Sequence, residues 1–242
     1  MSQTTDLKFS NLVLLVPLSS TLILWTVLLV ELRLGINLNH FGVYPRTISG
    51  LLGIFFSPFI HASIEHLYNN TIPFAVLLAS LFYFYRSISW KVVGYGLLLS
   101  GVLTWIIGRP SYHIGASGMI YMLASFIFFK GVFSRHIRLI ALSLFVVFVY
   151  GSMLWYIFPI QEGISWEGHL SGFLSGLFLV YMVDTVIPSE KKYEWEKEDY
   201  DEKEDEFLRH FDKDGNFIDE FGGDDQDETI RVTYHYREND GE

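Results

Sequence analysis

The sequence of 242 residues contains no cysteine. Disulfide bonds, a thiolate nucleophile and metal sites built from thiolates are therefore excluded. Charge is also scarce: only 18% of the residues are Asp, Glu, Lys or Arg, against about 25% in an ordinary soluble domain. No basic cluster is large enough to bind nucleic acid. Half of the residues are hydrophobic and the mean hydropathy is +0.30, so the composition predicts an integral membrane protein in a lipid bilayer.

Long, nearly continuous apolar runs account for this hydropathy. A helix rises about 1.5 Å per residue, so about 20 apolar residues cross the hydrocarbon core of a bilayer. Six runs approach this length, at residues 12–32, 64–85, 92–107, 114–129, 139–158 and 168–187. We expect an all-α membrane protein with a six-helix domain at 11–187, a short segment at 1–10 before it and a tail at 188–242.

The segment between the first two runs is unsuited to crossing a membrane. Residues 39–46 mix polar and aromatic side chains, and the apolar stretch 51–56 is too short to span. An interfacial or re-entrant loop is expected here.

Loop charges predict the orientation, because cytoplasmic loops of membrane proteins carry an excess of Lys and Arg. Basic residues occupy the loops on one side, whereas only acidic charges lie between the fifth and sixth runs. These are Arg86, Lys91, Arg135 and Arg138 on the first side, and Glu162 and Glu167 on the second. Arg33, Arg46 and Arg109 are exceptions on the outer side. We expect both termini to face the cytoplasm.

The C-terminal part differs in composition from the rest of the chain. Residues 187–242 hold 21 acidic and 8 basic residues, whereas the preceding 186 hold 6 and 9. Such a segment is expected to be a mostly disordered cytoplasmic tail, open to a cytoplasmic partner. The pattern Asp212–Asn216 hints at a calcium loop, but its glycine comes two positions early, which rejects an EF-hand. Alternation over Thr229–Tyr236 is typical of a short strand, which either pairs with a partner or stays disordered, because a lone strand is not stable.

A serine between glycines lies near the start of the fourth run, in Gly115-Ala116-Ser117-Gly118. Such small-residue clusters in membrane helices more often mark close helix packing than catalysis. A serine at a helix N-terminus does gain free backbone N–H groups and the positive end of the dipole, both suited to an oxyanion. In the predicted topology Ser117, His66 and His169 all lie at the same outer depth. Because polar groups in hydrocarbon are costly, this coincidence predicts a functional site.

The sixth run carries His169, which Gly172 follows after about one helical turn and Gly176 after about two. Gly172 and Gly176 are four residues apart on one helical face, which lets this helix press against another backbone, most naturally the glycine-flanked start of the fourth run. A single intramembrane histidine is more commonly a packed residue bonded to a neighbouring helix. In the functional alternative, a neutral His169 imidazole is the general base for Ser117.

Two further polar residues begin the second run. His66 and Asn70 lie on one helical face, and the sequence alone leaves open whether they form a polar helix entrance or two donors to an oxyanion. His61 and His66 are five residues apart, off one face of a helix, and no His-Glu-x-x-His occurs. A metal site is therefore not expected, and neither is a cofactor.

Tyr121 follows Ser117 by one helical turn. It is either a packing residue or a ring that lies against His169 and fixes its orientation. In Ser-His-Asp triads a carboxylate has that role. Glu65 is the only acidic residue predicted at the right depth, so a Ser-His dyad is expected.

Together these motifs resemble the rhomboid family of intramembrane serine proteases. The matching motifs are His66-x-x-x-Asn70 in the second run, Gly115-Ala116-Ser117-Gly118 with Tyr121 in the fourth, and Gly168-His169-x-x-Gly172-x-x-x-Gly176 in the sixth. The resemblance covers about residues 10–187 and leaves the tail unexplained. It implies a six-helix rhomboid-like bundle in a bacterial inner membrane, with an active site that opens to the outer face.

The resemblance also implies roles for individual residues. Ser117 resembles the nucleophile and His169 the general base, while His66, Asn70 and the Ser117 N–H resemble the oxyanion hole. Supporting residues are implied at Tyr121 on the histidine ring, at the glycines Gly115, Gly118 and Gly172, and at His61, which matches a further upstream histidine. The implied substrates are single-pass transmembrane proteins, cut near the outer end of their span through an acyl-enzyme. The alternative is a non-catalytic rhomboid-like binder of transmembrane segments, but such relatives typically lose the serine or the histidine.

One departure from the family concerns the first loop. Many rhomboids carry a Trp-Arg pair there, whereas this chain has Tyr44-Pro45-Arg46, so only Arg46 corresponds. The docking of this loop, and with it the substrate preference, is left open by the sequence.

Overall fold

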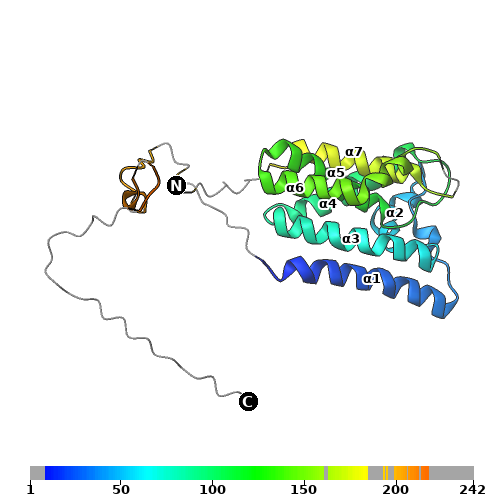
Figure 1. Ribbon diagram of the computed structural model, residues 1–242. Coiled ribbons are helices and arrows are strands. Elements are labelled where there is room, and N and C mark those ends of the chain that lie inside the picture. The colour runs from blue at the N-terminus through cyan, green and yellow to red at the C-terminus, as the bar shows by residue number, and fades with distance from the viewer. Residues whose placement is uncertain are drawn as a thin grey trace, which may run out of the picture. The chain divides into compact units, whose positions relative to one another are not determined.

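The computed structural model describes residues 9–160, 163–184, 193, 195, 199–205, 207–212 and 214–217. The chain divides into two compact units, 1–190 and 191–242. All helices long enough to build a core belong to the first unit (Figure 1). The predicted Thr229–Tyr236 strand lies outside the described residues.

Six long helices lie among the described residues of the first unit, which confirms the predicted all-α membrane bundle. They are α1 (Leu12–Leu34), α3 (Ile64–Phe84), α4 (Ser89–Ile107), α5 (Ser117–Ser134), α6 (Ile137–Tyr150), which the 3₁₀ helix η4 (Gly151–Ile157) continues, and α7 (Trp166–Met182). Within the described residues, α1, α3, α4, α5 and the segment Ile137–Ile157 are long and apolar enough to cross a membrane. With 17 residues, α7 spans about 25 Å, a little less than the hydrocarbon core.

Several predicted boundaries were wrong: the third helix begins at Ser89 instead of residue 92, and the fourth ends at Ser134 instead of residue 129. The fourth helix begins at Ser117 instead of residue 114, because His113 forms an antiparallel bridge with Val43 and Gly115 has φ 105°, which keeps the preceding residues out of the helix. The fifth helix tightens to 3₁₀ geometry at Gly151. The sixth begins at Trp166 and ends at Met182, five residues before the predicted end.

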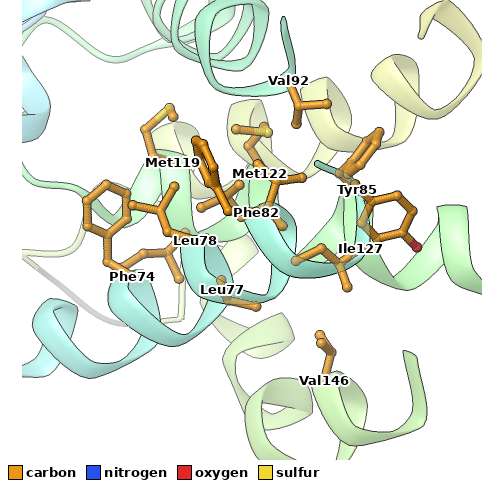
Figure 2. Packing of buried hydrophobic residues seen from close by; sticks show 14 of the residues in the cluster. Phe74, Leu77, Leu78, Phe82, Tyr85, Val92, Met119, Met122, Ile127 and Val146 are labelled. Carbon is orange, nitrogen blue, oxygen red and sulfur yellow. The ribbon is translucent and has the colours of Figure 1, made fainter. Parts of the chain in front are cut away.

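Helix α5 is the centre of the bundle. It packs against α3, α4, α6 and α7, while α1 packs on the outer side of α3 (Figure 1). Figure 2 shows Phe82 of α3 beside Met122 of α5, with Val92 of α4 and Val146 of α6 on either side. The helix faces turned away from this core expose apolar side chains, with Phe148 89% exposed, as expected for contact with lipid.

The first loop is a folded element. It contains η1 (Asn39–Phe41), η2 (Ser49–Leu51), the four-residue α2 (Gly53–Phe56) and η3 (Ser57–Phe59), and α2 packs against α4. The turns approach so closely that a Cβ added at Gly53 would lie 2.2 Å from the carbonyl carbon of Gly42. None of these pieces is long enough to span a membrane.

Arg46 fastens this loop to the end of α4. Its Nη1 donates to the carbonyl oxygens of Ile106 and Gly108 at 3.0 and 2.8 Å, and its backbone N–H donates to Trp105 at 3.1 Å. The Trp105 indole N–H returns a bond to the Thr47 carbonyl oxygen at 2.8 Å. The arginine therefore satisfies carbonyl groups that the end of a helix leaves without partners.

Replacing Arg46 by alanine should loosen the first loop without unfolding the bundle. Two charge-assisted hydrogen bonds are lost at a partly exposed position, which should cost about 1–2 kcal/mol. We expect a lower thermal midpoint in detergent and faster proteolysis within residues 39–59. Arg86→Ala is the control, because Arg86 is an exposed residue after α3. Equal proteolysis of the two variants would contradict the docking role of Arg46.

The second unit has a small turn among its described residues. Phe211 and Phe217 form an antiparallel bridge, and the Asp212 carboxylate accepts the backbone N–H groups of Asp214 and Asn216 at 2.9 and 2.8 Å. Asp212 therefore closes its own turn with the oxygens that a calcium loop would use as ligands.

Candidate active site

Ser117 is the first residue of α5 and lies at the end of a firmly held segment. The Gly115 N–H donates to the Ser57 carbonyl oxygen at 2.8 Å, and the Ala116 N–H donates to His61 Nε2 at 3.3 Å. Both acceptors belong to the first loop or the segment after it. The serine lines a cavity of about 40 Å³, together with the polar residues Ser57 and Thr104. This volume suits a few water molecules.

His61 is a buried acceptor, only 2% exposed. Burial lowers its pKa to about 4, and the neighbouring His66 ring, 5.1 Å away between centroids, adds to the effect. Because Nε2 accepts the Ala116 N–H, the neutral ring carries its proton on Nδ1. His61 thus supports the backbone directly before Ser117.

This pKa predicts a loss of stability in acid. An unfolded histidine titrates near 6.5, so the folded state resists protonation of His61. The stabilising contribution is complete above pH 6.5 and is lost as the pH falls toward 4, up to about 3 kcal/mol. The thermal midpoint should fall over this range, with a smaller fall in His61→Gln. Equal falls in both proteins would contradict this account of His61.

His66 and Asn70 lie beside the same segment. A Cβ added at Gly115 would lie 2.9 Å from His66 Nε2 and 3.6 Å from Asn70 Nδ2. Asn70 is buried, and its Nδ2 has no hydrogen-bond partner in the described part of the chain. A buried amide donor without a partner costs free energy, and here it lies next to the turn that leads into Ser117. It is therefore available to a ligand's oxygen.

The backbones of α5 and α7 touch, as the glycine spacing predicts. A Cβ added at Gly172 would lie 2.1 Å from the Gly118 carbonyl oxygen, and one at Gly176 would lie 2.3 Å from that of Met122. No side chain larger than hydrogen fits without a shift of one helix. This contact brings the first turn of α7, with His169, alongside the first turn of α5.

The His169 ring is held from two sides. It stacks on Tyr121 with centroids 4.3 Å apart and planes 12° from parallel, and its Nδ1 lies 3.0 Å from the Tyr156 carbonyl oxygen. A carbonyl oxygen only accepts, so Nδ1 carries the proton and Nε2 of the neutral ring keeps its lone pair. The Tyr121 hydroxyl donates to the Met153 carbonyl oxygen at 2.6 Å. The 3₁₀ helix η4 therefore orients both rings.

Two features of the site were not predicted from the sequence: the 3₁₀ helix η4 and one buried carboxylate. Glu65, predicted to be the acidic residue at the right depth, is exposed. Glu167, predicted to be an outer loop charge, lies in the first turn of α7 and is 1% exposed. Its place two residues before His169 is the signal that would have found it.

The sequence matches the family model of the rhomboid domain over residues 49–185. This chain belongs to the rhomboid family. It is therefore an integral membrane protein and an intramembrane protease of the rhomboid type or a relative of one.

Several proteins similar to this chain come from mycobacteria. This rhomboid is 37% identical over 177 residues to an uncharacterised protein of Mycobacterium tuberculosis, covering 66% of this chain and 71% of that protein. An uncharacterised protein of Mycobacterium bovis has the same values. One from Mycobacterium leprae is 33% identical over 177 residues, covering 66% of this chain and 67% of that protein.

Proposed function

We propose that this rhomboid is a serine endopeptidase that cleaves single-pass transmembrane proteins within the membrane. The proposal rests chiefly on one observation: His169 is stacked on Tyr121 and bonded through Nδ1 to the Tyr156 carbonyl oxygen, so its Nε2 keeps a lone pair, and the helix that carries it contacts the first turn of α5 at Gly118. A general base needs such a fixed tautomer with a free lone pair. Ser117 is the nucleophile whose hydroxyl proton this base would accept.

The reaction follows from these roles. The Ser117 hydroxyl oxygen attacks the substrate carbonyl carbon while His169 Nε2 takes the hydroxyl proton. The negative charge on the carbonyl oxygen is met by the Ser117 N–H, the Asn70 amide and the His66 ring. The C–N bond then breaks, and His169 gives its proton to the leaving amine. Water, activated by the same imidazole, hydrolyses the ester and restores Ser117.

The substrate class follows from the position of the site. We infer that both ends of the six-helix domain face the cytoplasm and that Ser117 lies below the outer face, so substrates are cut near the outer end of their span. A peptide bond within a helix is shielded by the surrounding side chains and bonded backbone, so the segment must unwind. Glycine or proline near the cut should therefore favour cleavage.

Reconstituted protein and a single-pass substrate test the proposal. Wild type in liposomes is mixed with substrates that carry glycine in the outer turn of their span, and the products are identified by mass spectrometry. We expect one cut in the outer third of the span. Substrates that remain intact but co-purify with folded wild type would favour a non-catalytic binder of transmembrane segments.

A further inference from the structure

A chain of hydrogen bonds joins the start of α7 to the loop before Ser117. The Gly168 N–H donates to Ser165 Oγ at 3.3 Å, and Ser165 Oγ lies 2.5 Å from His113 Nδ1. His113 Nε2 lies 3.1 Å from the Arg109 carbonyl oxygen. Since that oxygen only accepts, Nε2 carries the proton, and the Ser165 hydroxyl donates to Nδ1. Burial lowers the pKa of His113, which keeps this neutral form at pH 7.

An ion pair joins the same two segments. Glu167 Oε1 accepts the Arg109 backbone N–H at 3.2 Å and lies 3.7 Å from Arg109 Nε. Arg109 Nη2 also donates to the Ile164 carbonyl oxygen at 2.7 Å. The Glu167 side chain is only 2% exposed, against 45% for Arg109. Its Oε2 has no hydrogen-bond partner within the described ranges.

Stability alone does not explain this carboxylate. Burying a charge is costly unless the charge is fully paired and hydrogen-bonded, and well-packed apolar residues often replace buried ion pairs without loss. Among the described residues, one oxygen of Glu167 has no hydrogen-bond partner, so the pairing of this charge is incomplete. Its location is more informative, because Glu167 lies two residues before His169 and Arg109 lies eight residues before Ser117.

Contacts on two sides hold the loop that carries Arg109 and His113. On one side the first loop holds it through the Val43–His113 bridge and the bond from Gly115 to Ser57. On the other side the contacts of Arg109 and His113 hold it to the start of α7. This second support joins the loop that leads into Ser117 to the helix that carries His169, in addition to the direct contact of α5 with α7 at Gly172 and Gly118.

We propose that a group of positioning residues, here called the loop clamp, fixes the position of Ser117 relative to His169. The loop clamp consists of Arg109, His113, Ser165 and Glu167. The inference rests on the proposed protease function and extends it to residues that do not touch the substrate. Small displacements of reacting groups are costly, since about 1 Å can cost about a hundredfold in rate. A loosened clamp should therefore lower kcat and leave KM unchanged.

The test compares the cleavage kinetics of loop-clamp variants in liposomes. Labelling by a fluorophosphonate gives the concentration of active enzyme, so that kcat is calculated without the misfolded protein. Glu167→Ala should lower kcat about tenfold at constant KM. Glu167→Gln should recover part of this loss, because its amide oxygen still accepts the Arg109 N–H. Arg109→Ala should lower kcat about threefold to tenfold, and the double variant should be no slower than Glu167→Ala, because both act on one clamp.

Glu65→Ala is the matched control, since Glu65 is an exposed carboxylate in the first turn of α3, directly before His66. It should keep the kcat of wild type. A kcat within twofold of wild type in Glu167→Ala, or a rise in KM alone, would overturn the proposal. If Glu167→Ala does not fold, an unchanged kcat in Arg109→Ala would overturn it equally. Wild type without label or cleavage would instead refute the protease function itself.

Discussion

Replacing Ser117 by alanine should abolish cleavage while the bundle stays folded. The variant lacks the oxygen that would form the acyl-enzyme, and the oxyanion donors alone cannot replace a nucleophile. Loss of a triad serine in soluble proteases costs about 10⁶ in kcat, so a fall of at least about 10³ is expected here. The measurement is the rate of product formation from a single-pass substrate in liposomes.

The control for this variant lies on the same helix. Ser134 is at the other end of α5, where its hydroxyl donates to the Gly131 carbonyl oxygen at 2.6 Å. Ser134→Ala should cleave at the wild-type rate, and both variants should melt within a few degrees of wild type. Cleavage by Ser117→Ala at more than a few per cent of the wild-type rate would remove Ser117 from the role of nucleophile.

Gly172→Ala should have the second largest effect, because it pushes α7 away from α5. The added Cβ would lie 2.1 Å from the Gly118 carbonyl oxygen and 3.1 Å from the Tyr121 Cβ, and backbone cannot yield as a flexible side chain can. Overpacking of this kind typically costs about 1–3 kcal/mol. The shift also moves His169 relative to Ser117, so kcat should fall about a hundredfold. Thermal melting and cleavage kinetics measure the two effects.

Gly94 supplies the matched control on α4. It is also a helical glycine, but a Cβ added there meets nothing within 4 Å. Gly94→Ala should therefore keep full activity and gain about 0.5–1 kcal/mol of stability from the better helix former. If Gly172→Ala behaves like Gly94→Ala, the close contact between α5 and α7 is not what places His169.

The helices were predictable because each carries a local signal. Apolar runs of membrane length fall where α1, α3, α4, α5, α6 and α7 lie, and the spacing of Gly172 and Gly176 predicted which helix faces α5. These signals do not depend on contacts distant in sequence. The common outer depth of His66, Ser117 and His169 follows from the predicted topology and stays a prediction.

The parts that could not be predicted depend on contacts between distant segments. The start of α5 is set by the bridge between Val43 and His113, which is invisible in either segment alone. The acceptor for His169 Nδ1 is a main-chain carbonyl at Tyr156, and every residue type carries one, so no side-chain pattern marks it. A carboxylate in that role would have left a signal in the sequence.

The docking of the first loop could not be predicted for the same reason, because it too depends on contacts between segments distant in sequence. The sequence identified Arg46 as the arginine that corresponds to the family's first-loop pair, but left its docking open. Its partners are backbone carbonyls at Ile106 and Gly108, some 60 residues away, which composition cannot reveal. Glu167 was misplaced for a related reason, because a loop charge and a buried carboxylate in the first turn of a helix look alike until the partner Arg109 is known.

Labelling by a fluorophosphonate tests the central claim most directly, because this reagent reacts with serines activated by a base. Wild type, Ser117→Ala and His169→Ala are each treated in liposomes, and the labelled peptide is identified by mass spectrometry. We expect label on Ser117 in wild type and none in either variant. Folded wild type that takes no label, or His169→Ala that labels as fast as wild type, would contradict an activated Ser117–His169 pair.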